Sequence, residues 1–279
     1  MRKELIELIY QDNDILVINK PSGVSVTKDR ARLPQLVDFL AGQIGNEPTA
    51  KLRLVHRLDK DTSGVMILAR NRETQRKFAD YFFERKIQKT YLALVRGAVL
   101  QNKDVINSPI GHSKKKPELM IIDTRHGKES LTEWRLLADF GPVSLLSVNP
   151  LTGRTHQIRV HLASTGLPIA VDPLYGSNMP IMLSEFKKDY RLGKFQEEKP
   201  LIDRLTLHAY QIVIPESYVI PAEPFVIPAQ AGIHSNCFIA PLDKKFTATI
   251  KMLTKHNSQG PDAFFNPDDL ENILAGKPL

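Results

Sequence analysis

The sequence predicts an α+β protein built on a mixed, mostly antiparallel sheet that is flanked by helices. Short stretches rich in valine, isoleucine and leucine outnumber the stretches with helical spacing. These strand-like stretches follow one another in runs, without the regular alternation of strand and helix that a parallel sheet requires. Hydrophobic residues make up 42% of the 279 positions, which is enough for a large core.

The elements can be placed in chain order from apolar spacing and from turn and capping residues. The predicted strands are 14–19, two that flank a turn at 59–64, then 89–96, 129–137, 143–149, 205–214 and 246–251. The predicted helices are 34–44, about 72–86 with Asn71 as its N-cap, one that follows Gly153 and ends near Gly166, and a short one over 268–274.

Prolines interrupt the chain between the last two predicted strands. Ile-Pro pairs stand at 214–215, 220–221 and 227–228, and proline cannot donate to a sheet ladder. We therefore expect a proline-rich insertion over about 215–240. We expect residues 256–279, which are rich in proline, asparagine and aspartate, to form a C-terminal tail.

The composition narrows the class of protein. Lysine and arginine number 38 against 31 aspartates and glutamates, a net charge of +7, which fits a polyanionic partner but is also common for solubility alone. The single cysteine, Cys237, excludes an intrachain disulfide framework and is typical of a reducing compartment. Neither a secretory signal nor a long apolar run is present, so we expect a cytoplasmic protein without a membrane association.

Reactive side chains are concentrated in three stretches. These are HRLDKDTSG at 56–64, KTYLALV at 89–95 and LTGRTHQIRVH at 151–161. The first sets the carboxylate of Asp59 between two apolar runs, and burying a charge is costly unless it is paired or used. Taken alone, Asp59 could be a helix cap or part of a structural ion pair, and Tyr91 could be a core tyrosine.

The third stretch reads as a glycine turn that opens a helix. The N–H groups at a helix start favour anions, and Arg154 would add a cation beside them. Arg159 follows His156 by three residues, so both side chains can face the same way, although a solvated basic helix face remains the alternative. His156 and His161 are five residues apart, whereas a zinc-binding helix places its histidines four apart, so we expect no metal ion.

Taken together and in this order, the three stretches resemble the RluA family of RNA pseudouridine synthases. VINKPSGV (17–24), GLPIAVDPLYG (166–176) and LHAY (207–210) match further blocks of that family. The resemblance covers about 12–213 and resumes near 240–250. It implies a pseudouridine synthase fold with an active-site cleft across the sheet, in a catalytic domain over about 1–255. Many relatives carry an RNA-binding domain ahead of this one, and we expect none here.

The resemblance also implies a role for individual residues. Asp59 matches the catalytic aspartate, Tyr91 the tyrosine that packs against the target base, and Arg159 the basic partner of the aspartate. The residues expected to bind substrate and RNA are Arg57, which would displace the target nucleotide, Ile158, as a wall of the uracil pocket, and Arg154, His156, Lys114, Lys115 and Lys116.

The implied reaction is an isomerisation that needs no cofactor. The bond from uracil nitrogen 1 to ribose carbon 1′ breaks, and the base is rejoined through carbon 5, with one carboxylate as nucleophile or base. The implied partner is RNA, with ribosomal RNA favoured over transfer RNA, and we expect a monomer without an obligate protein partner.

Two other functions remain open at the level of sequence. A glycosidic hydrolase would use Asp59 and Asp61 as its carboxylate pair, but such carboxyls flank the bond about 5–10 Å apart, whereas these two share one turn. A non-catalytic RNA-binding module would have no need of the carboxylate of Asp59.

Overall fold

The computed structural model describes residues 5–27, 35–40, 43–44, 52–187, 190–191, 197–218, 233–234, 236–256 and 266–279. The chain divides into two compact units. The first unit comprises Met1–Lys89, His208–Pro241 and Ala275–Leu279, and the second comprises Thr90–Leu207 and Leu242–Leu274. Within the described residues, no helix is both long and apolar enough to span a bilayer.

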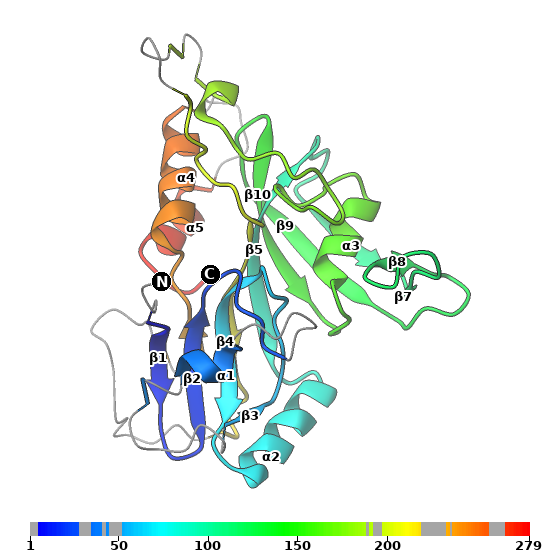
Figure 1. The fold of residues 1–279 in the computed structure, drawn as a ribbon, viewed down its shortest axis with the longest axis vertical. Coiled ribbons are helices and arrows are strands. Elements are labelled where there is room, and N and C mark those ends of the chain that lie inside the picture. The colour runs from blue at the N-terminus through cyan, green and yellow to red at the C-terminus, as the bar shows by residue number, and fades with distance from the viewer. Residues whose placement is uncertain are drawn as a thin grey trace. The chain divides into compact units, whose positions relative to one another are not determined.

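The first unit contains a mixed set of strands. β1 (Glu7–Gln11), β2 (Ile15–Lys20), β4 (Ser63–Ala69) and β11 (Leu207–Val213) are neighbours in that order. The first three pair antiparallel, as Figure 1 shows in blue and cyan, and β11 pairs parallel with β4. β3 (Arg53–Leu54) also pairs with β4. The strands predicted at 14–19, around the 59–64 turn and at 205–214 are thus confirmed.

Helix α2 (Arg72–Phe83) packs its apolar side on this unit. Asn71 is its N-cap, as predicted, and accepts a hydrogen bond of 2.8 Å from the Thr74 amide. The helix ends three residues earlier than predicted, just before Arg85 adopts a left-handed backbone with φ of 58°. Helix α1 (Leu36–Leu40) lies within the helix predicted over 34–44 but is shorter than predicted, because the described residues Gln35, Gln43 and Ile44 are not helical.

The region predicted as an insertion is packed at both of its described ends. Residues 219–232 and 235 lie outside the described residues. β13 (Cys237–Ile239) pairs antiparallel with β11, and β12 (Ile233–His234) pairs with β13. Phe238 is fully buried, and its ring centroid lies 5.3 Å from that of Tyr10. Tyr218, 4% exposed, packs edge-on against Phe78 of α2. These two aromatic side chains therefore belong to the core of the first unit.

The second unit contains an antiparallel sheet. Its strands run in the order β5 (Gln88–Arg96), β10 (Val143–Pro150), β9 (Leu131–Asp139) and β6 (Lys103–Asn107). β7 (Ile110–His112) and β8 (Met120–Ile122) form a separate hairpin. The predictions for 89–96, 129–137 and 143–149 are confirmed, whereas β1, β6, β7 and β8 were not predicted because they are short or carry too many polar residues.

Helix α3 (Gln157–Ser164) covers the second sheet and also contacts β8. Figure 1 shows this helix between β9 and the hairpin of β7 and β8. It ends as predicted, with Gly166 at φ of 81°. Its apolar side joins the largest described core cluster of this unit through Ile158 and Leu162. The helix consequently fixes the third reactive stretch on a rigid support.

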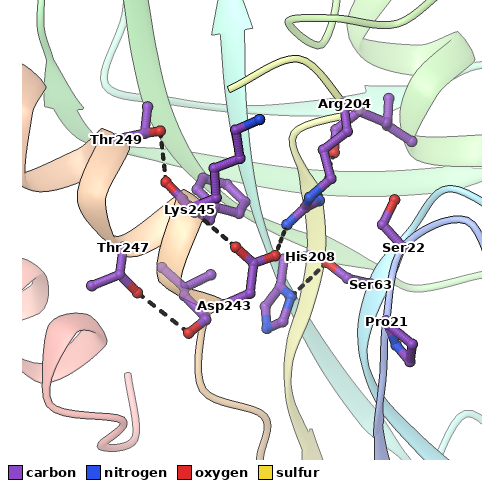
Figure 2. A network of polar contacts seen from close by, with 12 residues as sticks. Pro21, Ser22, Ser63, Arg204, His208, Asp243, Lys245, Thr247 and Thr249 are labelled. Atoms are coloured by element: carbon purple, nitrogen blue, oxygen red, sulfur yellow. Dashed lines mark hydrogen bonds and ion pairs between the residues drawn. The ribbon is translucent and has the colours of Figure 1, made fainter. Parts of the chain in front are cut away.

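The strand predicted over 246–251 is wrong, because this segment is part of helix α4 (Lys244–Lys255). Asp243 caps the helix by accepting from the Phe246 amide at 2.8 Å, and Figure 2 shows its carboxylate also held by Arg204. The buried residues recur with helical rather than strand spacing: Phe246, Thr249, Ile250 and Leu253. Helix α5 (Pro267–Leu274) confirms the short terminal helix, and a 3-10 turn spans Leu183–Glu185.

Candidate active site

The turn that carries Asp59 is attached to the turn of the NKPSG stretch by a buried lysine. Lys20 is fully buried, and its ammonium group donates to the carbonyl oxygens of Pro21 at 3.0 Å, Val24 at 2.9 Å and Lys60 at 2.9 Å. A buried charge of this kind is tolerated because it is well hydrogen-bonded. The bond to Lys60 fixes the residue directly after Asp59.

Two further hydrogen bonds join the same two turns. The Gly23 amide donates to the Lys60 carbonyl at 2.9 Å, and the Ser22 hydroxyl donates to the Asp61 carbonyl at 2.7 Å. Gly23 has a φ of 84°, a conformation that side chains with a Cβ rarely adopt. Asp59 itself is half-buried, and its carbonyl accepts from Thr62 across the turn. The backbone around Asp59 is therefore held on both sides.

Ser63 and Gly64, which follow this turn, contact His208 and Ala209 of the LHAY stretch. The His208 Nε2 lies 2.9 Å from the Ala240 carbonyl and must donate to it, so Nδ1 accepts from the Ser63 hydroxyl at 2.9 Å, the contact drawn in Figure 2. Gly64 has a φ of 119°, and a Cβ there would lie 2.1 Å from the Ala209 carbonyl oxygen. Only glycine lets β4 approach β11 so closely.

His56 in HRLD is a structural histidine. Its Nε2 accepts from the Ile67 amide at 2.9 Å, and its ring lies 4.9 Å from that of Phe82. Burial, together with the positive charge of Lys89, lowers the pKa of His56 to about 3, so the ring is neutral. Burial also lowers the pKa of Lys89 to about 8. Arg57, the next residue in HRLD, is exposed to solvent.

In the second unit, Tyr91 and Ile158 meet in one apolar cluster. Tyr91 lies on β5 opposite Val148 of β10 and is half-buried against this cluster. Ile158, on α3, is 6% exposed and belongs to the same cluster. Tyr91 was predicted to pack against the target base and Ile158 to form a wall of the uracil pocket, and the structure places both at the same apolar cluster.

Arg159 forms a buried ion pair with Asp172, which was not predicted as a site residue. Its Nε and Nη2 donate to the two carboxylate oxygens of Asp172 at 2.8 and 2.7 Å. The two side chains are 4% and 0% exposed. Burial opposes ionisation of Asp172, but Arg159 and the amides of Leu174 and Tyr175 outweigh it and lower the pKa of the carboxyl group. The predicted pairing of Arg159 with Asp59 concerns residues of different units and stays a prediction.

Tyr175, also not selected, contacts both basic residues of the third stretch. Its hydroxyl lies 2.8 Å from His156 Nδ1, and the Arg159 guanidinium lies 5.1 Å from the centre of its ring. His156 and Arg159 thus face the same way, as their spacing predicted. Asp172 and Tyr175 stand in the GLPIAVDPLYG stretch (166–176). An aspartate directly after an apolar run was the one sequence feature that could have marked Asp172 as a site residue.

Two further side chains of the third stretch, those of Arg154 and His161, are engaged within the protein to different degrees. The Arg154 amide donates to Gln157 Oε1 at 2.9 Å and its Nε to the Glu129 carbonyl at 3.1 Å, so this guanidinium is partly engaged within the protein. His161 is fully buried between the Thr132 hydroxyl and the Ser108 carbonyl, each 2.9 Å away. His161 is therefore a core residue of the second unit.

The predicted basic loop lies between β7 and β8. Lys114, Lys115 and Lys116 are all exposed at the tip of this hairpin. The tip is ordered by the Ser113 amide, which donates to Leu119 at 3.0 Å, and by the Ser113 hydroxyl, which accepts from the Lys116 amide at 3.1 Å. Three cations therefore project from a defined backbone.

Comparisons with known proteins agree with this arrangement. The family described as RNA pseudouridylate synthase matches residues 14–164. Ribosomal large subunit pseudouridine synthase D of Borreliella burgdorferi is 37% identical over 202 residues, which cover 68% of this chain and 62% of that protein. Ribosomal large subunit pseudouridine synthase C of Buchnera aphidicola is 39% identical over 207 residues, which cover 74% and 61%. The chain thus spans about three-fifths of the length of these relatives.

Solved structures share the fold. Human RNA Pseudouridylate Synthase Domain Containing 1 superposes with a TM-score of 0.59 at 27% identity, covering 91% of this chain and 96% of that one. Human RNA Pseudouridylate Synthase Domain Containing 4 gives a TM-score of 0.62 at 24% identity, covering 89% and 93%. The predicted fold class, a mixed and mostly antiparallel sheet with helices, is confirmed. The chain belongs to the RNA pseudouridylate synthase family, as its resemblance to the RluA family predicted.

Proposed function

We propose that this protein is an isomerase that converts uridine in RNA to pseudouridine. The observation that carries the proposal is the family match over residues 14–164, which includes all three reactive stretches. Asp59, Tyr91 and Arg159 stand within that range, each in a stretch that resembles a block of the family.

In the proposed reaction Asp59 acts on the ribose while the bond between carbon 1′ and uracil nitrogen 1 breaks. Carbon 1′ then bonds to carbon 5 of the same uracil, which loses its proton, while nitrogen 1 gains one. A carboxylate can attack carbon 1′ or remove a proton from carbon 2′, and neither route requires redox chemistry. Tyr91 packs against the uracil, and Arg159 favours the charged form of the carboxylate. Arg57 takes the place of the uridine that leaves its stack, a step that costs a few kcal/mol in base-flipping enzymes.

The proposed substrate is ribosomal RNA. Two of the most similar relatives are named as pseudouridine synthases of the large ribosomal subunit, and transfer RNA is the second candidate. The proposal places the protein with this substrate in the cytoplasm, acting as a monomer without a cofactor. Phosphates of the RNA would be contacted by Arg154, Lys114, Lys115 and Lys116.

The decisive experiment is the substitution Asp59→Asn. The amide is neither nucleophile nor base, so tritium release from RNA labelled at uracil carbon 5 should fall below a few per cent of wild type while RNA binding persists. Asp61→Asn is the matched control, a carboxylate in the same turn whose backbone carbonyl carries the bond to Ser22. Activity retained by Asp59→Asn would refute the proposal, and release of free uracil by the wild type would identify a hydrolase instead.

The RNA substrate can be identified separately. Pseudouridines stop primer extension after carbodiimide treatment, so ribosomal and transfer RNA from cells with and without the gene can be compared. We expect a stop to disappear from large-subunit ribosomal RNA. A stop lost only from transfer RNA would refute the ribosomal assignment.

A further inference from the structure

The hydroxyl group of Tyr175 joins two elements of the second unit. It accepts a hydrogen bond of 2.9 Å from the amide of Met120, the first residue of β8. It also lies 2.8 Å from Nδ1 of His156, the residue before α3. An amide can only donate, so the hydroxyl accepts from Met120 and can use its own hydrogen toward His156. One side chain thereby links the hairpin of β7 and β8 to the start of α3.

The ring of the same tyrosine supports two further groups. The Arg159 guanidinium lies 5.1 Å from the ring centre, within the range of a cation–π interaction. The ring also packs on the small apolar cluster of Ile110, Met120 and Val160, through which the hairpin contacts α3. Tyr175 therefore touches the hairpin, the helix and the arginine at once.

The backbone around Tyr175 is held in one conformation. The Asp172 carboxylate accepts from the amides of Leu174 at 2.9 Å and Tyr175 at 3.2 Å, while its carbonyl accepts from Gly176 at 3.0 Å. Val171, directly before this turn, has a φ of 58°, which is unusual for a β-branched residue. Backbone strain of this kind is characteristic of functional sites. The turn therefore presents Tyr175 as a fixed point.

We infer that Tyr175 is a positioning residue that couples the basic hairpin to Arg159, so that phosphate binding at Lys114, Lys115 and Lys116 is linked to the orientation of the arginine. A phosphate bound at the lysines would fix the position of the hairpin tip and, through it, of β8. The hydrogen bond from the Met120 amide would then fix the tyrosine hydroxyl. The catalytic half of the inference rests on the proposed function. The binding half rests on the hairpin contacts alone.

The test is a double-mutant cycle measured by filter binding to RNA across several salt concentrations. Tyr175→Phe keeps the ring below Arg159 and removes only the hydroxyl. It should weaken binding by about five-fold, the equivalent of one hydrogen bond, and flatten the salt dependence, because the lysines lose their fixed position. In a protein in which Lys114, Lys115 and Lys116 are all replaced by alanine, the same change should weaken binding by less than about two-fold.

Turnover supplies a second readout. Tyr175→Phe, which keeps the ring beside Arg159, should lower turnover at saturating RNA less than Tyr175→Leu, which also removes the ring, and both variants should weaken binding. The matched control is Tyr81→Phe in the first unit, where the hydroxyl lies 3.2 Å from that of Ser217; it should leave the salt dependence unchanged. Circular dichroism of each variant checks that it is folded.

The outcomes separate this inference from the proposed function. Equal effects of Tyr175→Phe in the presence and absence of the three lysines would overturn the coupling, even if the wild type releases tritium from labelled RNA. A wild type that shows the coupling in binding but releases no tritium would overturn the isomerase proposal and leave the positioning role in RNA binding. A wild type that does not bind RNA would overturn both.

Discussion

At the scale of single residues, buried polar side chains hold the reactive stretches in place. Lys20 supports the turn of Asp59 through carbonyl oxygens, and Asp172 holds Arg159 through both of its carboxylate oxygens. Each is buried, and each makes hydrogen bonds that offset the loss of hydration. The neutral ring of His56 likewise holds the backbone of Ile67, by accepting a hydrogen bond from its amide.

The low pKa of His56 predicts an acid-sensitive stability. The folded ring resists protonation down to about pH 3, whereas the value in an unfolded chain is 6.5. Below pH 6.5 the unfolded state therefore takes up a proton that the folded state excludes. Stability should fall by about 1.4 kcal/mol for each pH unit between these values, and no such loss arises above pH 6.5.

Urea unfolding at pH 7 and pH 5 measures this effect. The wild type should lose about 2 kcal/mol more than His56→Gln over this interval, because glutamine does not titrate. The control is His126→Gln, at a histidine whose side chain is 76% exposed, and it should follow the wild type. Parallel curves for the wild type and His56→Gln would contradict the assignment.

The ion pair of Arg159 and Asp172 predicts a large loss of stability when it is broken. Asp172→Ala leaves a buried guanidinium without its carboxylate, which should cost about 3–5 kcal/mol of the free energy of unfolding. Asp203→Ala breaks the exposed pair with Lys245 (side chains 54% and 45% exposed) and should cost less than about 1 kcal/mol. Urea unfolding measures both losses. Similar values in the two variants would show that burial of the Arg159–Asp172 pair does not increase its contribution to stability.

At the scale of elements, most of the long strands and helices could be predicted from local signals. Asn71 and Gly166 mark the ends of α2 and α3 because capping is a short-range interaction. The same local rule could have found α4 from Asp243, but the apolar residues after it were read as a strand. β13 has three residues and exists because it pairs with β11, a contact that no local pattern encodes.

The candidate site was predictable in its motifs but not in its supports. Asp59, Tyr91 and Arg159 were found from segments that resemble a known family. The contact of Tyr175 with Met120 joins residues 55 positions apart, and that of Lys20 with Lys60 joins residues 40 positions apart. Such pairs become visible only when the chain is folded.

β13 predicts that part of the proline-rich region is essential to the first unit. Phe238→Ala removes a fully buried ring that packs on Tyr10, and a large aromatic truncation in a core costs about 3–5 kcal/mol. We expect this loss in urea unfolding, compared with Phe83→Ala, at a side chain that is 89% exposed. A loss of unfolding free energy below 1 kcal/mol in Phe238→Ala would mean that β13 is not essential to the first unit.

At the scale of the whole molecule, the chain passes between the two units repeatedly. It leaves the first unit after Lys89, returns at His208, leaves again after Pro241 and returns at Ala275. The last residues bind β11, where the Tyr210 hydroxyl donates to the Lys277 carbonyl at 2.6 Å and the Leu279 amide donates to Gln211 Oε1 at 3.1 Å. The first unit is therefore assembled from segments far apart in sequence.

Removal of residues 275–279 should consequently destabilise β11. The loss of two hydrogen bonds should cost about 2 kcal/mol and speed amide exchange in residues 207–213. In a Tyr210→Phe background, which already lacks one of these bonds, the same truncation should cost about half as much. Unchanged exchange in β11 after truncation would show that these contacts contribute nothing measurable.

The interleaved path also constrains how the protein can be made. A nascent chain that has emerged only to residue 207 contains neither β11 and β13 of the first unit nor α4 of the second. Both units then expose apolar surface on the ribosome at the same time. Neither is complete until translation nears the end of the chain, because the second unit ends at Leu274 and the first at Leu279. This is the interval in which a chaperone would be needed, and a stalled or truncated message would release a product in which neither half is complete.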